Sequence, residues 1–290
     1  MLSAASAAAE YFSFVRKADP SDSFQCSILS RQSSRYSFHI PGSDAPVVKL
    51  NSVEAVFFGF LTVRQVNPAG NPVRLSIRAD RFSGSIDGRT VNTGLPQGAR
   101  IEADLAGGKA VFSRDGKLLP HDVQSLLGTL FPPASDHTIA DLAGKSRSLP
   151  EPGNGWKPEL KPFIDMLARR GVRLAPNAFR SGITYHGTER VGKLQCRRFS
   201  LLIETAKLAD YDCRFKMTFS MAPSGPPVSS VREVTEVIRQ VMHSSRPFVS
   251  GTKIELVNQD HTERSLIPVP SVPPPKAPKK PAGAWETLLH

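Results

Sequence analysis

The feature that most constrains the fold is a run of strict two-residue alternation in residues 211–221. Every second side chain in this run is apolar, and the side chains between them are polar or charged. A helix cannot produce this pattern, because its side chains return to the same face about every 3.6 residues. The run therefore predicts a half-buried strand of an antiparallel sheet. Its apolar positions are Tyr211, Cys213, Phe215, Met217, Phe219 and Met221.

Similar but shorter patterns recur along most of the chain. Residues 73–79 alternate in the same way, and a Pro/Gly/Asn-rich turn at 67–72 joins them to residues 53–66, their predicted hairpin partner. The Asp87-Gly88 and Asp115-Gly116 pairs predict tight hairpin turns, because both residue types accept a positive φ. The sequence thus favours a mainly β fold. Further predicted strands cover residues 24–29, 35–40, 83–86, 90–92, 99–105, 109–113, 182–188, 194–203 and 252–257.

Two segments have helical periodicity. Residues 122–130 place Val123, Leu126, Leu127 and Leu130 on one face, between Pro120 and Pro132-Pro133. Residues 158–170 place Leu160, Phe163, Ile164 and Leu167 on one stripe and end at Gly171. We interpret both apolar stripes as surfaces that pack on a sheet.

Residues 231–242 fit two interpretations. Ser230 and Glu233 form a capping-box pattern, and apolar residues recur at helical spacing, which favours a helix. The same apolar residues are all β-branched, and a Gly/Pro-rich stretch at 224–227 is suited to a hairpin loop, which favours a strand. At this point both interpretations stand.

Composition excludes several classes of protein. The chain has 290 residues, 40% hydrophobic and 22% charged, which is the range of ordinary globular domains and not of a coiled coil, a collagen or a wholly disordered chain. The net charge of +11 is spread along the strands without a basic tract, so we expect no nucleic-acid partner. No stretch reaches the roughly 18 apolar residues of a transmembrane helix.

Cysteine and histidine spacing gives no sign of a metal site. Cys26, Cys196 and Cys213 contain no C-x-x-C pair, and no two of the seven histidines lie four apart on a helix. Cys26 and Cys213 fall at apolar positions of strands, and Cys196 is expected to be a buried or bridged thiol. We therefore expect neither a metal nor a cofactor.

Three regions are expected along the chain. Residues 1–20 form a disordered N-terminus or the remnant of a signal peptide, because small residues precede Glu10 as at a secretory cleavage site. Residues 21–263 form one compact β-rich unit, with halves at about 21–150 and 172–263 joined by a helical middle. Residues 264–290 form a basic, proline-rich tail. The expected location is the periplasm or cell envelope, with the cytoplasm as the alternative.

The order of turns and helices resembles that of uncharacterised exported bacterial proteins. The resemblance rests on Asp87-Gly88, Leu95-Pro96-Gln97-Gly98, Phe112 with Asp115-Gly116, the helix ending at Leu130-Phe131-Pro132, the Gly153-x-Gly155-Trp156 loop, and Gly192 with Cys196. These proteins are similar in outline to the half-barrels of periplasmic lipoprotein carriers. Over residues 20–260 the resemblance implies a curved antiparallel sheet, covered by two or three helices, whose concave face holds an apolar ligand.

Three functional hypotheses follow. The first is a non-enzymatic envelope protein that binds an apolar small molecule or lipid in a sheet cavity, with Trp156, Phe215, Met217 and Phe219 as ligand-binding residues, although core packing explains these side chains as well. The second is an interaction scaffold that engages an envelope protein through the tail residues Lys276, Lys279, Lys280 and Trp285. The third is a hydrolase that uses His121 or His137, each of which adjoins an aspartate.

Overall fold

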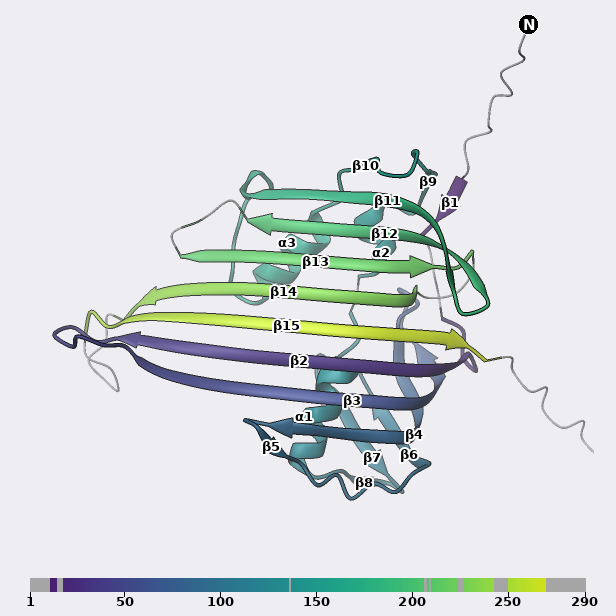
Figure 1. Cartoon of the computed structure of the whole chain (residues 1–290), viewed down its shortest axis with the longest axis horizontal. Coiled ribbons are helices and arrows are strands. Elements are labelled where there is room, and N and C mark those ends of the chain that lie inside the picture. The colour runs from purple at the N-terminus through teal and green to yellow at the C-terminus, as the bar shows by residue number, and fades with distance from the viewer. Residues whose placement is uncertain are drawn as a thin grey trace, which may run out of the picture.

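An open antiparallel sheet organises the chain (Figure 1). The computed structural model describes residues 11–14, 18–135, 137–205, 208, 210–223, 227–242 and 250–269. In this part of the chain thirteen strands form the sheet. They are β2 (Ser23–His39), β3 (Val47–Val66), β4 (Pro72–Ile86), β5 (Arg89–Thr90), β6 (Ala99–Asp104), β7 (Val111–Arg114), β8 (Lys117–Leu118), β10 (Gly155–Trp156), β11 (Phe179–Val191), β12 (Leu194–Thr205), β13 (Tyr211–Met221), β14 (Pro227–Val241) and β15 (Lys253–Pro268).

The strand order brings the first and the last long strands of the described residues together. It runs β10-β11-β12-β13-β14-β15-β2-β3-β4-β6-β7-β8, with β5 on β4, so β15 pairs with β2 at the centre of the sheet. Hairpin turns at Asp87-Gly88 and Asp115-Gly116 have positive φ at all four residues, as their sequence predicts. The predicted mainly β, antiparallel fold is confirmed.

The helices of the described residues are α1 (His121–Leu130), α2 (Ile139–Ala143) and α3 (Lys161–Arg169), together with a short 3-10 turn, Pro176–Ala178. All three α-helices lie on one face of the sheet, behind it in the view of Figure 1. We call this the covered face and the opposite one the open face. None of these helices is long and apolar enough to span a bilayer.

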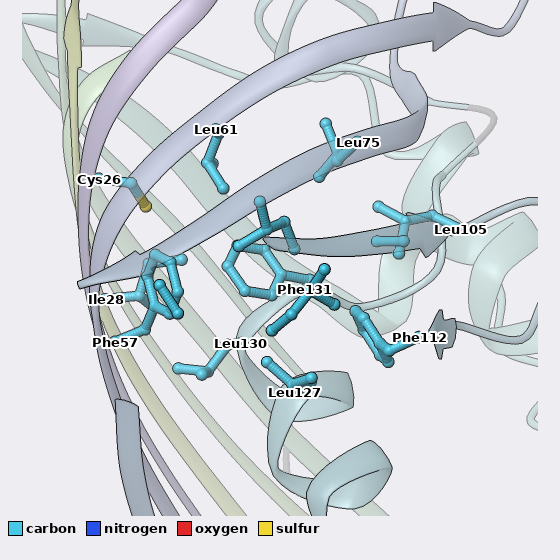
Figure 2. Close-up of a cluster of buried hydrophobic side chains, with 14 of the residues drawn as sticks. Cys26, Ile28, Phe57, Leu61, Leu75, Leu105, Phe112, Leu127, Leu130 and Phe131 are labelled. Carbon is cyan, nitrogen blue, oxygen red and sulfur yellow. The ribbon is translucent and has the colours of Figure 1, made fainter. Parts of the chain in front are cut away.

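Helix α1 packs on the N-terminal half of the sheet. Val123, Leu126, Leu127 and Leu130 are its buried residues, which confirms the stripe predicted from the sequence. They meet side chains of β2, β3, β4, β6 and β7 in a core that we call the α1 cluster (Figure 2). Its fully buried members include Cys26, Ile28, Phe57, Ile77, Ile101, Phe112, Leu126, Leu127 and Leu130.

The C-terminal half has a separate core, the aromatic cluster. Its buried rings are Phe12, Phe14, Phe163, Tyr185, Phe199, Tyr211 and Phe219. α2, α3 and the strand pair β1 (Tyr11–Ser13) and β9 (Ser146–Ser148) cover this half. The predicted boundary of the N-terminal region at residue 20 is therefore wrong for residues 11–14. Phe12 and Phe14 carry enough apolar surface to bind this segment to the core. Residues 1–10 lie outside the described residues.

The structure decides the open alternative at 231–242 and corrects two further predictions. Residues 231–241 belong to a strand, β14, because β13 and β15 pair with it on either side and satisfy its backbone. Strand β15 continues to Pro268, five residues into the predicted tail. α3 begins at Lys161 and not at 158, with Pro162 in its first turn. The remainder of the tail, with Lys276, Lys279, Lys280 and Trp285, lies outside the described residues.

The predicted strands at 24–29 and 35–40 form one continuous strand, β2. The sequence conceals this continuity because the residues between them are polar on both faces. Ser30, Gln32 and Ser34 lie on the covered face but belong to a polar strip between the two clusters. A stretch of polar residues has no apolar periodicity from which a strand can be predicted. Its backbone nevertheless pairs with β3 without interruption.

Candidate functional site

The candidate site is a cavity of about 440 Å³ on the covered face, where the two clusters approach each other. A volume of this size is typical of small-ligand pockets, which span roughly 300–1,000 Å³. One wall carries apolar side chains of the α1 cluster, and the opposite wall carries side chains of the aromatic cluster. The first group is Ala18, Phe24, Leu61, Val63, Leu75, Leu105, Phe131, Ala134 and Leu266, and the second is Phe14, Ile139 and Met217.

The segment between α1 and α2 forms a further wall of the cavity and is fixed to the sheet. Asn71 Nδ2 donates a hydrogen bond of 2.7 Å to the carbonyl of Ser135, and Asn67 Nδ2 donates one of 3.1 Å to the same carbonyl. The Ala134 N–H donates to the carbonyl of Leu105 at 2.9 Å. Both asparagines belong to the turn that the sequence predicted between β3 and β4. This turn therefore shapes the cavity as well as the hairpin.

Arg264 of β15 brings a charged side chain to this mainly apolar cavity from the sheet. The polar side chains of the lining are Asn71, Ser135, His137, Thr138 and Ser230. Its Nη2 donates a hydrogen bond of 2.8 Å to the carbonyl of Leu130, the last residue of α1. No carboxylate of the described residues forms an ion pair with it. Burial lowers the pKa of Arg264, and the positive charge of Arg232 acts in the same direction. The guanidinium is therefore a poorly compensated cation beside an apolar space.

A polar strip adjoins the cavity on the covered face. Arg232 of β14 binds Asp260 of β15 at 2.8 Å, and Asp260 also accepts a hydrogen bond from Gln32 at 3.3 Å. Two buried polar atoms of the strip, Ser30 Oγ and Arg232 Nε, have no hydrogen-bond partner among the described residues. Strands β14, β15 and β2 thus bring charged groups to the face that elsewhere packs the core.

Glu236 is the most deeply buried carboxylate of the strip. It accepts hydrogen bonds from Arg170 at 2.7 Å, from the Tyr211 hydroxyl at 2.9 Å and from Asn258 at 3.0 Å. Burial by itself raises the pKa of Glu236, but these hydrogen bonds outweigh burial and the net pKa is lowered. The carboxylate is thereby held ionised, and it connects α3 to the centre of the sheet.

A larger hollow, of about 610 Å³, lies on the open face and differs from the cavity in its chemistry. Its charged groups are already paired, among them Arg31 with Glu54 at 3.2 Å and Lys216 with Glu233 at 3.1 Å. Charges that are already paired on an exposed face are weak evidence for a ligand. The cavity on the covered face is smaller, but it joins apolar walls to an unpaired cation, so we regard it as the better candidate.

The four ligand-binding residues predicted from the sequence lie in or against the aromatic cluster. Met217 also lines the cavity. Phe219 is buried beside Phe199, with ring centroids 5.4 Å apart, and Phe215 packs on Phe163 of α3 at 6.0 Å. Trp156 of β10 donates its indole N–H to the carbonyl of Ala143 at 3.0 Å. The structure thus brings one of the four, Met217, to the cavity wall.

The two histidines of the hydrolase hypothesis lie apart, with the whole of α1 between them. His121 is the first residue of α1 and is exposed, whereas His137 lines the cavity. The hydroxyls next to His137 already bind the backbone: Ser135 Oγ accepts the His137 N–H at 3.0 Å, and Thr138 forms a capping box with Asp141. No nucleophile and base come together here within the described residues.

A serine–histidine pair that the sequence did not indicate lies on the open face. His186 Nε2 is 2.8 Å from Ser200 Oγ, across β11 and β12. The nearby Glu189 binds Arg198 and Ser220. A catalytic serine requires a histidine that a third group orients, and Glu189 is engaged elsewhere. We interpret the pair as a cross-strand hydrogen bond.

All three cysteines are free and buried, as expected for small apolar residues of strands. Burial raises the pKa of Cys26 to about 12. Such a thiol is un-ionised at neutral pH and therefore unreactive.

Within the described residues no group of histidine, cysteine or acidic side chains is arranged to hold a metal ion.

No protein-family model matches the sequence, and no curated protein matches it. The class of protein that the structure defines is an open antiparallel sheet with helices on one face and a small apolar cavity beneath them. Its function must be argued from the cavity itself.

Proposed function

We propose that this protein is a non-enzymatic binding protein of the cell envelope, which holds an apolar small molecule or lipid in the cavity between the α1 and aromatic clusters. The observation that carries the proposal is the lining: twelve apolar side chains from both clusters line about 440 Å³. Apolar walls with one or two polar groups are typical of ligand pockets. The resemblance to lipoprotein carriers agrees with this assignment.

The hydrogen bonds that fix the cavity walls also support the proposal, because they oppose collapse of the cavity. Asn67 and Asn71 hold the α1–α2 segment, and Arg264 holds the end of α1. Walls that are anchored by hydrogen bonds keep the space open, so a ligand pays little to order them.

The first test is binding of an uncharged fluorescent probe, N-phenyl-1-naphthylamine, to the full chain. Ser230→Phe places a large ring into the cavity from β14, because Ser230 lines it next to Arg264. We expect the wild type to bind the probe and Ser230→Phe to bind it at least about tenfold more weakly. The matched control is Ser229→Phe on the same strand, whose side chain points to the open face and is expected to leave binding unchanged.

Native mass spectrometry provides an independent test. The protein purified from its own host is compared before and after organic denaturation, and we expect an adduct that dissociates on denaturation. A bare mass together with no probe binding would refute the proposal. In that case the scaffold hypothesis, which rests on the tail beyond residue 269, becomes the leading one.

A further inference from the structure

The cavity contains a cation whose binding capacity is largely unused. A guanidinium presents five N–H donors, and within the described residues Arg264 forms one hydrogen bond, to the carbonyl of Leu130. Two other arginines on this side of the sheet are paired with acids: Arg232 with Asp260 at 2.8 Å, and Arg170 with Glu236 at 2.7 Å. Arg264 differs from both, because no acid of the described residues pairs with it.

The surroundings of Arg264 increase the demand for a negative charge. Arg264 and Arg232 are diagonal neighbours on β15 and β14, since Arg264 pairs with Ser230 and Arg232 pairs with Thr262. Burial and the charge of Arg232 both lower the pKa of Arg264, so its charged form is disfavoured without a partner. Arg264 is half-buried, and a charge that loses part of its hydration is normally paired, because otherwise the loss is not compensated.

Two further unsatisfied atoms lie in the next row of the sheet. Ser30 pairs with Thr262 across β2 and β15, and Thr262 pairs with Arg232, so the three residues form one row beside Arg264. Ser30 Oγ and Arg232 Nε are buried and have no partner among the described residues. Neither residue lines the cavity, but their row lies next to Arg264, so the polar groups around this cation are not fully satisfied by the described residues.

We propose that the ligand of this cavity is an amphiphile with an anionic head group, a carboxylate or a phosphate, and that Arg264 binds this head group while the apolar tail fills the cavity. The planar guanidinium matches both groups by two parallel hydrogen bonds. The inference rests on the proposed function, because it names the class of ligand for the same cavity.

A purely structural role for Arg264 is the competing explanation. A cation at the C-terminal end of a helix is favourable by itself, and Arg264 binds the last carbonyl of α1. The two roles differ in one measurable respect. A structural arginine affects charged and uncharged ligands equally, whereas a head-group site affects the charged ligand alone.

The experiment compares a fluorescent acid, 11-(dansylamino)undecanoic acid, with its methyl ester on the full chain at pH 7.5. We expect the wild type to bind the acid at least about tenfold more tightly than the ester, as a charge-assisted hydrogen bond is worth that factor or more. Arg264→Met should weaken binding of the acid by about the same factor and change binding of the ester by less than about twofold. Arg31→Met, on the open face, is the matched control and should change neither.

Competition identifies the source of the anion. Dodecanoate and dodecyl phosphate are each titrated against the bound acid probe, with dodecanol as the uncharged control. We expect both anions to displace the probe more strongly than dodecanol, and the stronger of the two identifies the head group. Arg264→Lys, which keeps the charge but not the planar fork, should bind the acid less tightly than the wild type and serves if Arg264→Met does not fold.

The outcomes separate the two proposals. Equal binding of acid and ester by the wild type, or displacement by dodecanol as strong as by the anions, refutes the head-group site and leaves the apolar cavity intact. An equal loss for acid and ester in Arg264→Met also refutes it, in favour of the structural role. Binding of neither probe to the wild type refutes the head-group site, and together with a bare mass in native mass spectrometry it refutes the proposed function itself.

Discussion

The two halves of the sheet are covered in different ways. The α1 cluster is closed by one amphipathic helix with four fully buried residues, Val123, Leu126, Leu127 and Leu130. The aromatic cluster is closed by several short pieces, namely β1, β9, α2 and α3, and fills its space with rings. A single helix follows from local sequence, whereas a cover made of separate segments requires the tertiary structure to assemble it. The cavity lies where the two kinds of cover meet and neither fills the space.

The largest expected effect concerns the centre of the aromatic cluster. Phe199→Ala removes a fully buried ring, so we expect the free energy of unfolding to fall by about 3–5 kcal/mol, measured by urea denaturation. Phe58→Ala, whose ring is exposed on the open face, is the control and should cost about 0.5 kcal/mol or less. A similar loss in both variants would show that the rings of this cluster contribute no more than surface residues. The rings in contact with Phe199 are Phe12, Phe14, Trp156, Tyr185 and Phe219.

A second substitution tests whether the halves are independent. Leu126→Ala opens a cavity under α1, and we expect a loss of about 2–5 kcal/mol. Because α1 packs on β2, β3 and β4, hydrogen exchange should rise in these strands more than in β12. An equal rise in β12 would contradict the comparison and show that the sheet unfolds as one unit.

Alanine substitutions at two glycines, one facing α1 and one within it, test how closely α1 packs on the sheet. A Cβ at Gly84 of β4 would lie 2.5 Å from the carbonyl oxygen of Glu54 and 2.8 Å from Leu126 Cδ2, so Gly84→Ala should cost about 1–3 kcal/mol. At Gly128, within α1, a Cβ meets nothing within 4 Å. Gly128→Ala should therefore stabilise the protein by about 0.5–1 kcal/mol, through helix propensity. Thermal melts of both variants test the pair, and a neutral Gly84→Ala would mean that α1 packs less closely on β4.

The smallest expected effect is a pH dependence in the polar strip between the halves. Since the folded pKa of Glu236 lies below its ordinary value of 4.5, its interactions stabilise the protein above that pH. This stabilisation should be lost as the pH falls below about 4.5. Urea unfolding at several pH values should show a weaker acid dependence for Glu236→Gln than for the wild type. Glu263→Gln, on the open face of β15, is the control, and an unchanged slope in Glu236→Gln would contradict the prediction.

Much of the fold was predictable from periodicity. Alternation identified β13, and helical spacing identified the buried face of α1, because each pattern reflects contacts on one side of an element. The site was mostly not predictable. Met217 was named from the sequence, but Arg264 and Arg232 were not, since β14 fits two periodicities and β15 is polar on both faces over residues 258–265. A residue at the predicted start of a tail gave no reason to expect a cation beside a cavity.

By itself the sequence determined the strands with one apolar face, the tight Asp-Gly turns and the helix with one apolar stripe. These are properties of neighbouring residues, and each segment carries the physical reason for its conformation. The tertiary structure alone decided that β15 pairs with β2, which lies more than two hundred residues earlier in the chain. That pairing places Arg264 next to Ile28 and beneath the end of α1. Burial and electrostatic environment depend on segments far apart in the sequence, so the cavity and its cation exist only once the sheet has formed.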